Sequence, residues 1–284
     1  MKDKVDALLK DVTKIPTMSN VVVKVMELVQ DPAVSIPLLS KEISKDPSIT
    51  ASIIRMSNSA YYRASKPIRT VQEALMTLGI QTVKEIIVIS ASKTVLHKDL
   101  KGYQLEADEM WSHSLVVAEL SAKIVNLKKI KEVPKDLAFT AGLLHDIGKV
   151  ILTQFFPFKI IEIRDELKSM NTTFIELEKK HFGYNHQEVG YKVMEVWNFP
   201  DELKEVVAFH HEPQKSTKFP LLSSIVHIAN TIAIISGIGI DIGGINQELS
   251  SFALEKTKIN DGDLERIYME IPDIQKLIAD LHHT

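Results

Sequence analysis

The sequence predicts an all-α protein, and three observations support that prediction. Apolar residues recur at intervals of three and four over residues 18–30, 36–44, 50–57 and 71–78, which is the period of an amphipathic helix. No stretch shows the strict alternation of a half-buried strand. Helix start and stop signals punctuate the same segments, so we expect many short helices joined by short turns.

Capping residues and glycines mark the expected helix ends. The dipeptides Asp31-Pro32 and Asp46-Pro47 each place a capping carboxylate before a proline that the first helical turn tolerates. Glycines stand where helices would stop, at Gly79, Gly102 and Gly183. Longer helices are expected over residues 106–129, 135–154, 185–198, 200–211, 220–236 and 261–282. Loops are expected over residues 97–104, 212–219 and 236–246.

The composition narrows the class of protein. With 284 residues, the chain is long enough for one extended domain or two closely packed subdomains. A formal net charge of −3 argues against a strongly basic nucleic-acid surface. Because the chain has no cysteine, it has no disulfide and no thiolate zinc site. This fits a reducing cytoplasm and leaves His, Asp and Glu as the available metal ligands.

No segment predicts insertion into a membrane. Residues 1–6 carry charges where a signal peptide needs an apolar stretch. The longest apolar candidate, residues 225–240, is interrupted by His227 and Asn230, so a buried helix is the better interpretation. We therefore expect a cytoplasmic protein with neither a membrane nor a nucleic acid as partner.

Histidine and acidic residues recur at positions that suit a metal site. The pair His145-Asp146 lies in an otherwise apolar run, residues 139–149, where both side chains are costly to bury unless a cation pairs with them. Further candidate ligands lie on both sides of this pair: Glu109, His113, His186, His210 and His211. Glu109 and His113 are four residues apart, so a helix places them on one face.

A single histidine is more often a packed or surface residue than a metal ligand. Here four separate helical segments each supply one or two candidates, and that combination favours a shared ion over chance. Imidazole nitrogen together with carboxylate oxygen favours iron, manganese, zinc or nickel over calcium. The sequence therefore predicts a site for one or two divalent ions.

At these residues the chain resembles a known family. Residues 139–149 are similar to the signature of the HD superfamily of metal-dependent phosphohydrolases. The N-terminal half resembles the HDOD branch, the HD-related output domain of bacterial signalling proteins. The segments that carry this second resemblance are Ile15-Pro-Thr-Met, Asp31-Pro, Ser44-Lys-Asp-Pro-Ser-Ile-Thr, Arg55-Met-Ser-Asn-Ser-Ala-Tyr61, residues 68–79, and the stretch from Val189-Gly to Pro200 with Trp197. They occur in the family's order over about residues 10–235.

The resemblance implies a multi-helical HD-type core packed against an N-terminal helical subdomain. We accordingly expect the N-terminal helical part over residues 1–100, the HD-type core over 101–236 and C-terminal helices over 237–284. Apolar residues at helical spacing in the last segment fit a helix that closes the core or, alternatively, a homodimer contact.

The related HD-GYP phosphodiesterases indicate which residues would bind metal. Their ligands come from positions that here read Glu109 or His113, His145, Asp146, His186, His210 and His211. Two departures stand out. Where catalytic HD proteins place a late ligating aspartate, this chain has Asn230, which offers a neutral oxygen and no charge. No Gly-Tyr-Pro follows Glu212, so specific hydrolysis of a cyclic dinucleotide is not implied.

Two functions follow from the resemblance. A hydrolase would use Asp146 at the ions and Lys149, one turn further, to meet a phosphate, although Lys149 could equally be a solvated helix-face residue. Because one anionic ligand is missing, we expect a non-catalytic or weakly catalytic signalling module that binds a signalling protein or a small nucleotide-like ligand. The alternative is an active metal-dependent phosphohydrolase, a phosphodiesterase or nucleotide phosphatase. Tyr61, Tyr62 and Arg63 are a candidate partner surface.

Overall fold

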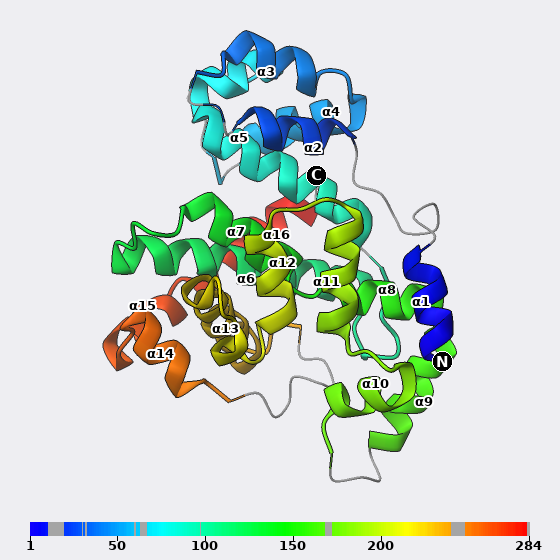
Figure 1. The fold of residues 1–284 in the computed structure, drawn as a ribbon. Coiled ribbons are helices and arrows are strands. Elements are labelled where there is room, and N and C mark those ends of the chain that lie inside the picture. The colour runs from blue at the N-terminus through cyan, green and yellow to red at the C-terminus, as the bar shows by residue number, and fades with distance from the viewer. Residues whose placement is uncertain are drawn as a thin grey trace. The chain divides into compact units, whose positions relative to one another are not determined.

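The structure, a computed structural model, is all-α, as the sequence predicts (Figure 1). It describes residues 1–10, 20–29, 31, 33–59, 61–62, 67–96, 98–167, 172–239 and 248–282. Among these residues, extended backbone pairs at one isolated bridge, between Leu100 and Leu105. The predictions for Ile15-Pro-Thr-Met, Pro32, Arg63 and most of the 236–246 loop concern residues outside the described part.

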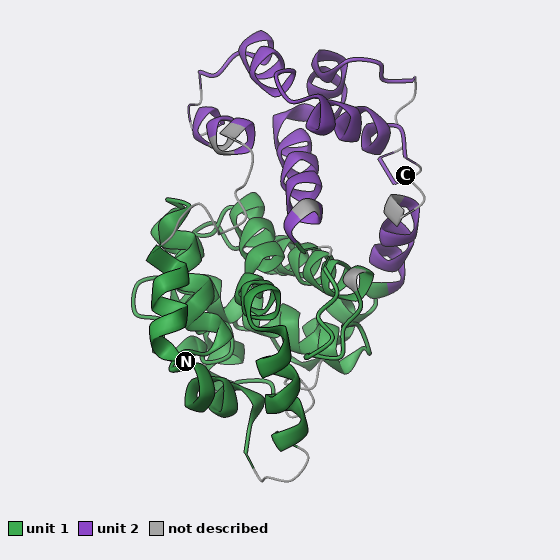
Figure 2. Ribbon diagram, turned by 90° about the vertical axis from the view of Figure 1, so that its right-hand side faces the viewer, with its two compact units in different colours: residues 1–16, 96–271 green, residues 17–95, 272–284 purple. Residues whose placement is uncertain are grey.

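The contacts divide the chain into two compact units, coloured separately in Figure 2. Unit 1 comprises residues 1–16 and 96–271, and unit 2 comprises residues 17–95 and 272–284. The expected domain boundaries at residues 100 and 236 stay predictions, and the units group these residues differently. The first residues belong with the part that follows residue 96, and the last residues with the N-terminal helices.

Unit 2 is built from short helices and one long one. They are α2 (Asn20–Leu28), α3 (Ile36–Ile43), α4 (Pro47–Ser57), α5 (Val71–Leu96) and α16 (Ile271–His282), the last two extending to the unit's boundary. The predicted start of α4 is confirmed, because the Asp46 side chain accepts hydrogen bonds from the backbone N–H groups of Ser48 and Ile49. Pro47 occupies the first helical turn, where no N–H is needed.

Gly79 interrupts α5 and confirms the predicted helix stop. Its φ of 85° and ψ of 162° are not helical, and a positive φ suits a residue without a Cβ. The stretch Val71–Lys93 has a mean hydropathy of 1.4 and would by length and composition suit a membrane span. The break at Gly79 leaves each part shorter than the ~20 continuous helical residues that a bilayer requires. No other segment of the described residues meets these criteria.

Unit 1 contains the remaining helices. They are α1 (Lys2–Lys10), α6 (Ala107–Lys128), α7 (Lys135–Leu144), α8 (Ile147–Phe155), α9 (Pro157–Leu167), α10 (Phe174–Phe182), α11 (His186–Val196), α12 (Asp201–Phe209), the short 3₁₀ helix η1 (Pro213–Lys215), α13 (Pro220–Ile235), α14 (Ser251–Thr257) and α15 (Asp261–Tyr268). α6 packs against α7 and α13, and α11 packs against α8 and α12. Large buried side chains such as Trp111 and Phe139 fill the interior between these helices.

Two expected helices are each divided in the structure. The expected helix over residues 261–282 ends at Tyr268 and begins again at Ile271. The expected helix over residues 135–154 ends at Leu144, and a new one begins at Ile147. His145 Nδ1 bonds the carbonyl oxygen of Gly142 at 2.7 Å, and such a local side-chain bond competes with the helical ladder. The His145-Asp146 pair therefore lies at a turn between α7 and α8 and not within one regular helix.

The C-terminal helices pack within the chain. Their predicted apolar positions include Ile267, which is 1% exposed, and Leu277, also 1% exposed. Ile271 and Ile278 are likewise buried. This favours the interpretation of helices that close a core over that of a bare homodimer face, and a homodimer stays a prediction.

Candidate metal centre

The predicted histidines and Asp146 meet in unit 1, although separate helices supply them. His113 comes from the second turn of α6, His145 and Asp146 from the turn between α7 and α8, and His186 from the start of α11. The His210-His211 pair directly follows α12. His113, His145, Asp146, His186 and His210 are each no more than 3% exposed, and His211 is half-buried.

Asp146 is the centre of the cluster. One carboxylate oxygen, Oδ1, lies 3.4 Å from His210 Nε2 and 3.6 Å from His186 Nε2. The other, Oδ2, lies 3.3 Å from His145 Nε2 and 3.9 Å from His113 Nε2. Asp146 thus belongs to two potential ligand groups, one with His186, His210 and His211 and one with His113 and His145. Within each group the ligand atoms lie within 4.8 Å of one another, which suits two ions that share Asp146.

The outer ring nitrogens of the histidines fix which atom faces the centre. Nδ1 of His113, His145 and His210 contacts the backbone carbonyls of Ile238, Gly142 and Val207 at 3.0, 2.7 and 3.0 Å. A carbonyl can only accept, so each Nδ1 carries the proton and each Nε2 presents a lone pair towards Asp146. Such an outer bond is the usual support of a metal-binding histidine.

Several atoms at the centre lack a hydrogen-bond donor. Among the described residues, His145 Nε2, His210 Nε2 and Asp146 Oδ1 are buried without a partner. Buried acceptors that face one another without a donor are unfavourable unless a cation lies between them. The residues present therefore fit a divalent metal of the kind that imidazole and carboxylate ligands favour.

The charges of the cluster favour metal binding over protonation. Burial is the main cause that lowers the pKa of His113 to about 4, and electrostatic interactions with His145 and Lys149 lower it further. Burial likewise lowers the pKa of His210 to about 3 and holds that of His211 well below its usual range. Burial alone would raise the pKa of Asp146, but the charge of Lys149 and the electrostatic interaction with His145 outweigh it and hold that pKa well below its usual range. Near neutral pH these rings are thus neutral and the carboxylate is charged.

Close helix packing brings His186 next to Asp146. A Cβ added to Gly148 would lie 1.8 Å from the carbonyl oxygen of His186 and 2.9 Å from the amide nitrogen of Gly190. Glycine at position 148 therefore permits α8 and α11 to approach closely just after Asp146. This contact sets the distance between two of the metal-binding candidates.

A family model matches the part of the chain that holds these residues. The sequence model of the HDOD domain matches residues 15–213, a range that contains the whole cluster. The chain belongs to the HDOD family. The resemblance inferred from the sequence is thereby confirmed.

Solved structures share this HDOD fold. An HDOD domain protein of unknown function from Geobacter sulfurreducens has a TM-score of 0.76 and 22% identity, covering 98% of this chain and 97% of its own. A protein from Marinobacter aquaeolei VT8, provisionally described as a signal transduction protein, has a TM-score of 0.80 and 16% identity over 99% of this chain and 65% of its own. A protein from Shewanella amazonensis SB2B, provisionally described as a phosphohydrolase, has a TM-score of 0.67 and 22% identity, covering 93% and 97%. These likenesses establish the fold.

A curated sequence relative is an uncharacterized protein from Treponema pallidum (strain Nichols). It is 21% identical over 225 residues, which cover 78% of this chain and 43% of the relative. The chain thus spans less than half the length of this relative.

Lys149 of the HDOD chain contacts the cluster directly. Its ammonium group lies 2.6 Å from Asp146 Oδ2 and 5.8 Å from the centre of the Tyr103 ring. The side chain is only 8% exposed, so the alternative of a solvated helix-face lysine does not apply. Lys149 balances the charge of Asp146 in the absence of other cations, and a catalytic role for either residue stays a prediction.

Glu109 and Asn230 differ from the other candidates. Glu109 is exposed and not among the clustered ligands, because its carboxylate accepts a hydrogen bond from the Glu106 backbone N–H as part of a capping box at the start of α6. Asn230 is buried on α13, and neither atom of its amide has a hydrogen-bond partner among the described residues. Its role as a ligand stays a prediction.

Sequence reasoning missed the residues that support the cluster from outside. Glu178, fully buried on α10, accepts hydrogen bonds from the hydroxyl of Tyr103, from the His186 backbone N–H at 2.9 Å and from His186 Nδ1 at 2.8 Å. His227, on α13, donates from Nδ1 to the His210 carbonyl at 2.8 Å. Glu178 lies in a charged segment with no motif around it, so nothing in the sequence separates it from a surface glutamate.

Proposed function

We propose that this HDOD protein is a cytoplasmic signalling module that retains a metal centre and acts mainly by binding, with little or no hydrolytic activity. One observation carries this proposal. Inward-facing imidazole nitrogens converge on a buried carboxylate with too few donors to satisfy them. This geometry favours a bound cation, with His113, His145, Asp146, His186, His210 and His211 as its ligands.

Two features of the site favour binding over catalysis. Asn230 stands where catalytic relatives place a charged ligand, so the site carries less negative charge to hold a second ion. The ammonium of Lys149 is paired with Asp146 Oδ2, which reduces the charge that this bridging carboxylate can offer. Both features lower the affinity for a second ion, on which phosphoryl hydrolysis in a two-ion site depends.

The alternative, an active phosphohydrolase, rests on the same residues. A divalent ion would supply activation of water and neutralisation of phosphoryl charge. Asp146 stays ionised because its pKa is low, so its carboxylate is available to bind the ion or to accept a proton. Lys149 would have to leave Asp146 to contact a substrate phosphate.

Metal analysis and a turnover assay separate the two functions. We expect the purified protein to contain iron, manganese, zinc or nickel, and a generic phosphodiester to turn over no faster than with a variant carrying both His145→Ala and Asp146→Ala. Metal-dependent turnover that disappears in this double variant would overturn the binding role and establish the hydrolase.

A single substitution tests whether Asn230 lies at the ions. Asn230→Asp restores the negative charge of the catalytic relatives, so we expect stronger metal retention during dialysis against a chelator. Unchanged metal content in this variant would place Asn230 away from the metal.

The partner is proposed to be a signalling protein or a small nucleotide-like ligand. Tyr61 is 40% exposed and meets Tyr62 edge to face at 5.0 Å, which suits a partner surface on unit 2. The net charge of −3 disfavours a nucleic acid. We therefore expect binding to a signalling protein or to a small nucleotide-like ligand.

A further inference from the structure

Residues that follow the HDOD match support the metal centre from outside. The match ends at residue 213, and the chain continues through α13 to α14. The turn at residues 236–239, which ends α13, contacts His113. Ser250, which directly precedes α14, reaches His210 through one further side chain. The two contacts serve different halves of the cluster, because His113 belongs to one potential ligand group and His210 to the other.

The turn after α13 holds the ring of His113. The Ile238 N–H donates to the Ala233 carbonyl at 3.0 Å, so the chain turns back at the end of the helix. The Ile238 carbonyl accepts from His113 Nδ1, also at 3.0 Å. Gly239 lies against the same side chain, because a Cβ added there would be 2.4 Å from His113 Cβ. The turn therefore fixes both the position and the orientation of this ring.

His227 joins the start of α14 to His210. Its imidazole is 2% exposed and donates from Nδ1 to the His210 carbonyl at 2.8 Å. Because a carbonyl can only accept, Nδ1 carries the proton and Nε2 presents a lone pair. Nε2 accepts from the Ser250 backbone N–H at 3.1 Å. One neutral ring thus connects the backbone at the start of α14 with the backbone of a candidate metal ligand.

The packing of the helices adds to these hydrogen bonds. α14 packs against α13, and α15 packs against α6, the helix that supplies His113. An ion pair of 2.6 Å between Lys128 on α6 and Asp263 on α15 supports the second contact. The two helices that follow Ser250 are therefore held by the same helices that carry residues of the metal centre and its support.

We propose that metal binding and the packing of α14 are coupled, with His227 and Ser250 acting as positioning residues for His210. When an ion is bound, His210 stays in place and its carbonyl keeps the ring of His227 oriented towards the Ser250 N–H. The coupling is reciprocal, so release of α14 lowers the affinity for the ion by the same factor by which the ion favours the packed helix. The turn at residues 236–239 acts on His113 in the same way.

This coupling depends on the proposed metal centre and gives it a means of regulation. A part of the chain outside the HDOD match responds to whether an ion is bound. A partner that binds α14 in its packed state would therefore distinguish the metal-bound protein from the metal-free one.

Ser250→Pro removes the N–H that His227 accepts. Ser250 has a φ of −68°, which the proline ring adopts, and α7 and α12 already begin after Pro134 and Pro200. Ser250→Ala is the matched control, because it removes the hydroxyl that caps α14 and keeps the N–H. We expect Ser250→Pro to bind zinc roughly five-fold more weakly than Ser250→Ala does. A competition titration of the full chain with a chelating dye measures both affinities.

Two glycines test the turn after α13. Gly237 and Gly239 have positive φ angles of 81° and 64°, so an alanine is strained at either position. The added Cβ would meet nothing within 4 Å in Gly237→Ala, but it would meet His113 in Gly239→Ala. We expect Gly239→Ala to bind zinc roughly ten-fold more weakly than Gly237→Ala does. Equal affinities would overturn the role of this turn.

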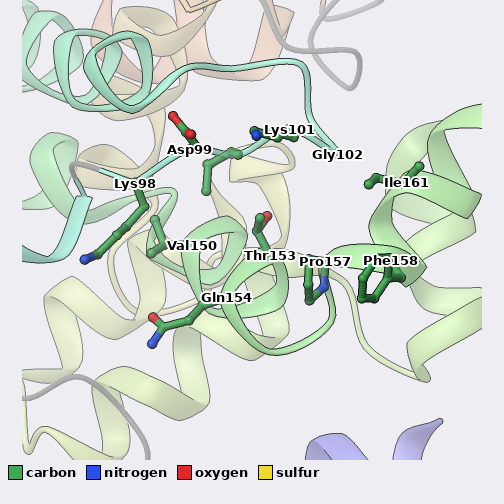
Figure 3. Close-up of a pocket in the computed structure, with 11 residues that line it drawn as sticks. Lys98, Asp99, Lys101, Gly102, Val150, Thr153, Gln154, Pro157, Phe158 and Ile161 are labelled. Atoms are coloured by element: carbon green, nitrogen blue, oxygen red, sulfur yellow. The ribbon is translucent and has the colours of Figure 1, made fainter.

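Hydrogen exchange shows whether metal binding affects α14. The internal reference is α9, whose residues Pro157, Phe158 and Ile161 line a separate cleft of about 490 Å³ (Figure 3) and take no part in either contact. Zinc should slow exchange over residues 248–257 more than exchange in α9. This excess should disappear in Ser250→Pro and persist in Ser250→Ala.

The outcomes separate the coupling from the metal centre itself. If zinc slows exchange equally in α14 and α9, or if Ser250→Pro binds zinc as Ser250→Ala does, the coupling is overturned and the metal centre stands. If the unaltered chain binds neither zinc nor manganese, both proposals fail. Denaturation of the metal-free variants shows whether each one folds, and exchange in the unaltered chain tests the coupling even where a variant does not.

Discussion

Glu178 shows how one buried carboxylate can orient a candidate metal ligand, His186, from behind its ring. It accepts from both the backbone N–H and the ring Nδ1 of His186, so it fixes the ring's orientation and its tautomer. The same carboxylate accepts from the Tyr103 hydroxyl, which comes from the loop between α5 and α6. A negative charge behind the ring also makes Nε2 a better electron donor to a metal.

Substituting Glu178 tests this support. Glu178→Gln keeps the size of the side chain and removes its charge, so we expect metal affinity to fall by about 10- to 100-fold in a competition titration with a chelating dye. Glu205→Gln is the matched control. Glu205 is also buried in unit 1, but it accepts from Ser216 and from the Lys218 backbone and does not touch the cluster. Equal losses in both variants would contradict a specific role for Glu178.

The histidines also predict how stability depends on pH. The pKa values of about 4 for His113 and about 3 for His210 lie below the value of 6.5 for an unperturbed histidine. Between these values the unfolded chain binds more protons than the folded one, so stability is full above pH 6.5 and falls as the pH drops towards 4. Each histidine accounts for about 2 kcal/mol between pH 7 and 5.

Denaturation of the metal-free protein at several pH values measures this effect. We expect His113→Gln, which cannot be protonated, to reduce the difference in unfolding free energy between pH 7 and pH 5. A variant with an unaltered pH dependence would show that His113 keeps an ordinary pKa. Asp146 acts in the same direction at lower pH, because its lowered pKa favours the folded state until the carboxylate is protonated.

At the scale of helices, the contact of α8 with α11 positions the metal centre. Gly148→Ala would place a methyl group 1.8 Å from the His186 carbonyl oxygen, a backbone atom that can move only with its helix. We expect a loss of about 3 kcal/mol or more in unfolding free energy, together with loss of bound metal. Urea denaturation and metal analysis measure the two effects. Gly262→Ala is the control, because the nearest atom there is at 3.4 Å and the residue is helical.

The helices differ in how well the sequence predicts them. The period of apolar residues located α6 to within two residues, and the Asp46-Pro47 signal located the start of α4. Both are local features, which a single segment determines by itself. The turn at His145-Asp146 was not predicted, because the apolar pattern continues through it. The hydrogen bond from the His145 ring to the Gly142 carbonyl leaves no mark in that pattern. The candidate ligands could be named from residue type, but Glu178 and Tyr103 could not, because their partners are distant in sequence.

At the scale of the whole molecule, the candidate metal ligands are confined to one unit. All clustered ligands lie in unit 1, so a bound ion stabilises the folded form of that unit and adds nothing directly to unit 2. Hydrogen exchange of the full chain measures both units in one sample. On chelation we expect faster exchange of amides in α6 and α11 and unchanged exchange in α4. A uniform change over both units would contradict this assignment.

The path of the chain between the units affects how the protein folds as it is made. α1 is separated in sequence from the residues it contacts. Asp6, on α1, accepts a hydrogen bond from the hydroxyl of Tyr184, which lies 178 positions later in the chain. At about 5–20 residues per second, a ribosome needs roughly ten to forty seconds to make the intervening chain. For that time the apolar side chains Val5, Leu8 and Leu9 have no native surface to cover them. The nascent α1 is consequently a segment that a holding chaperone can reach while α2 to α5 are already emerging.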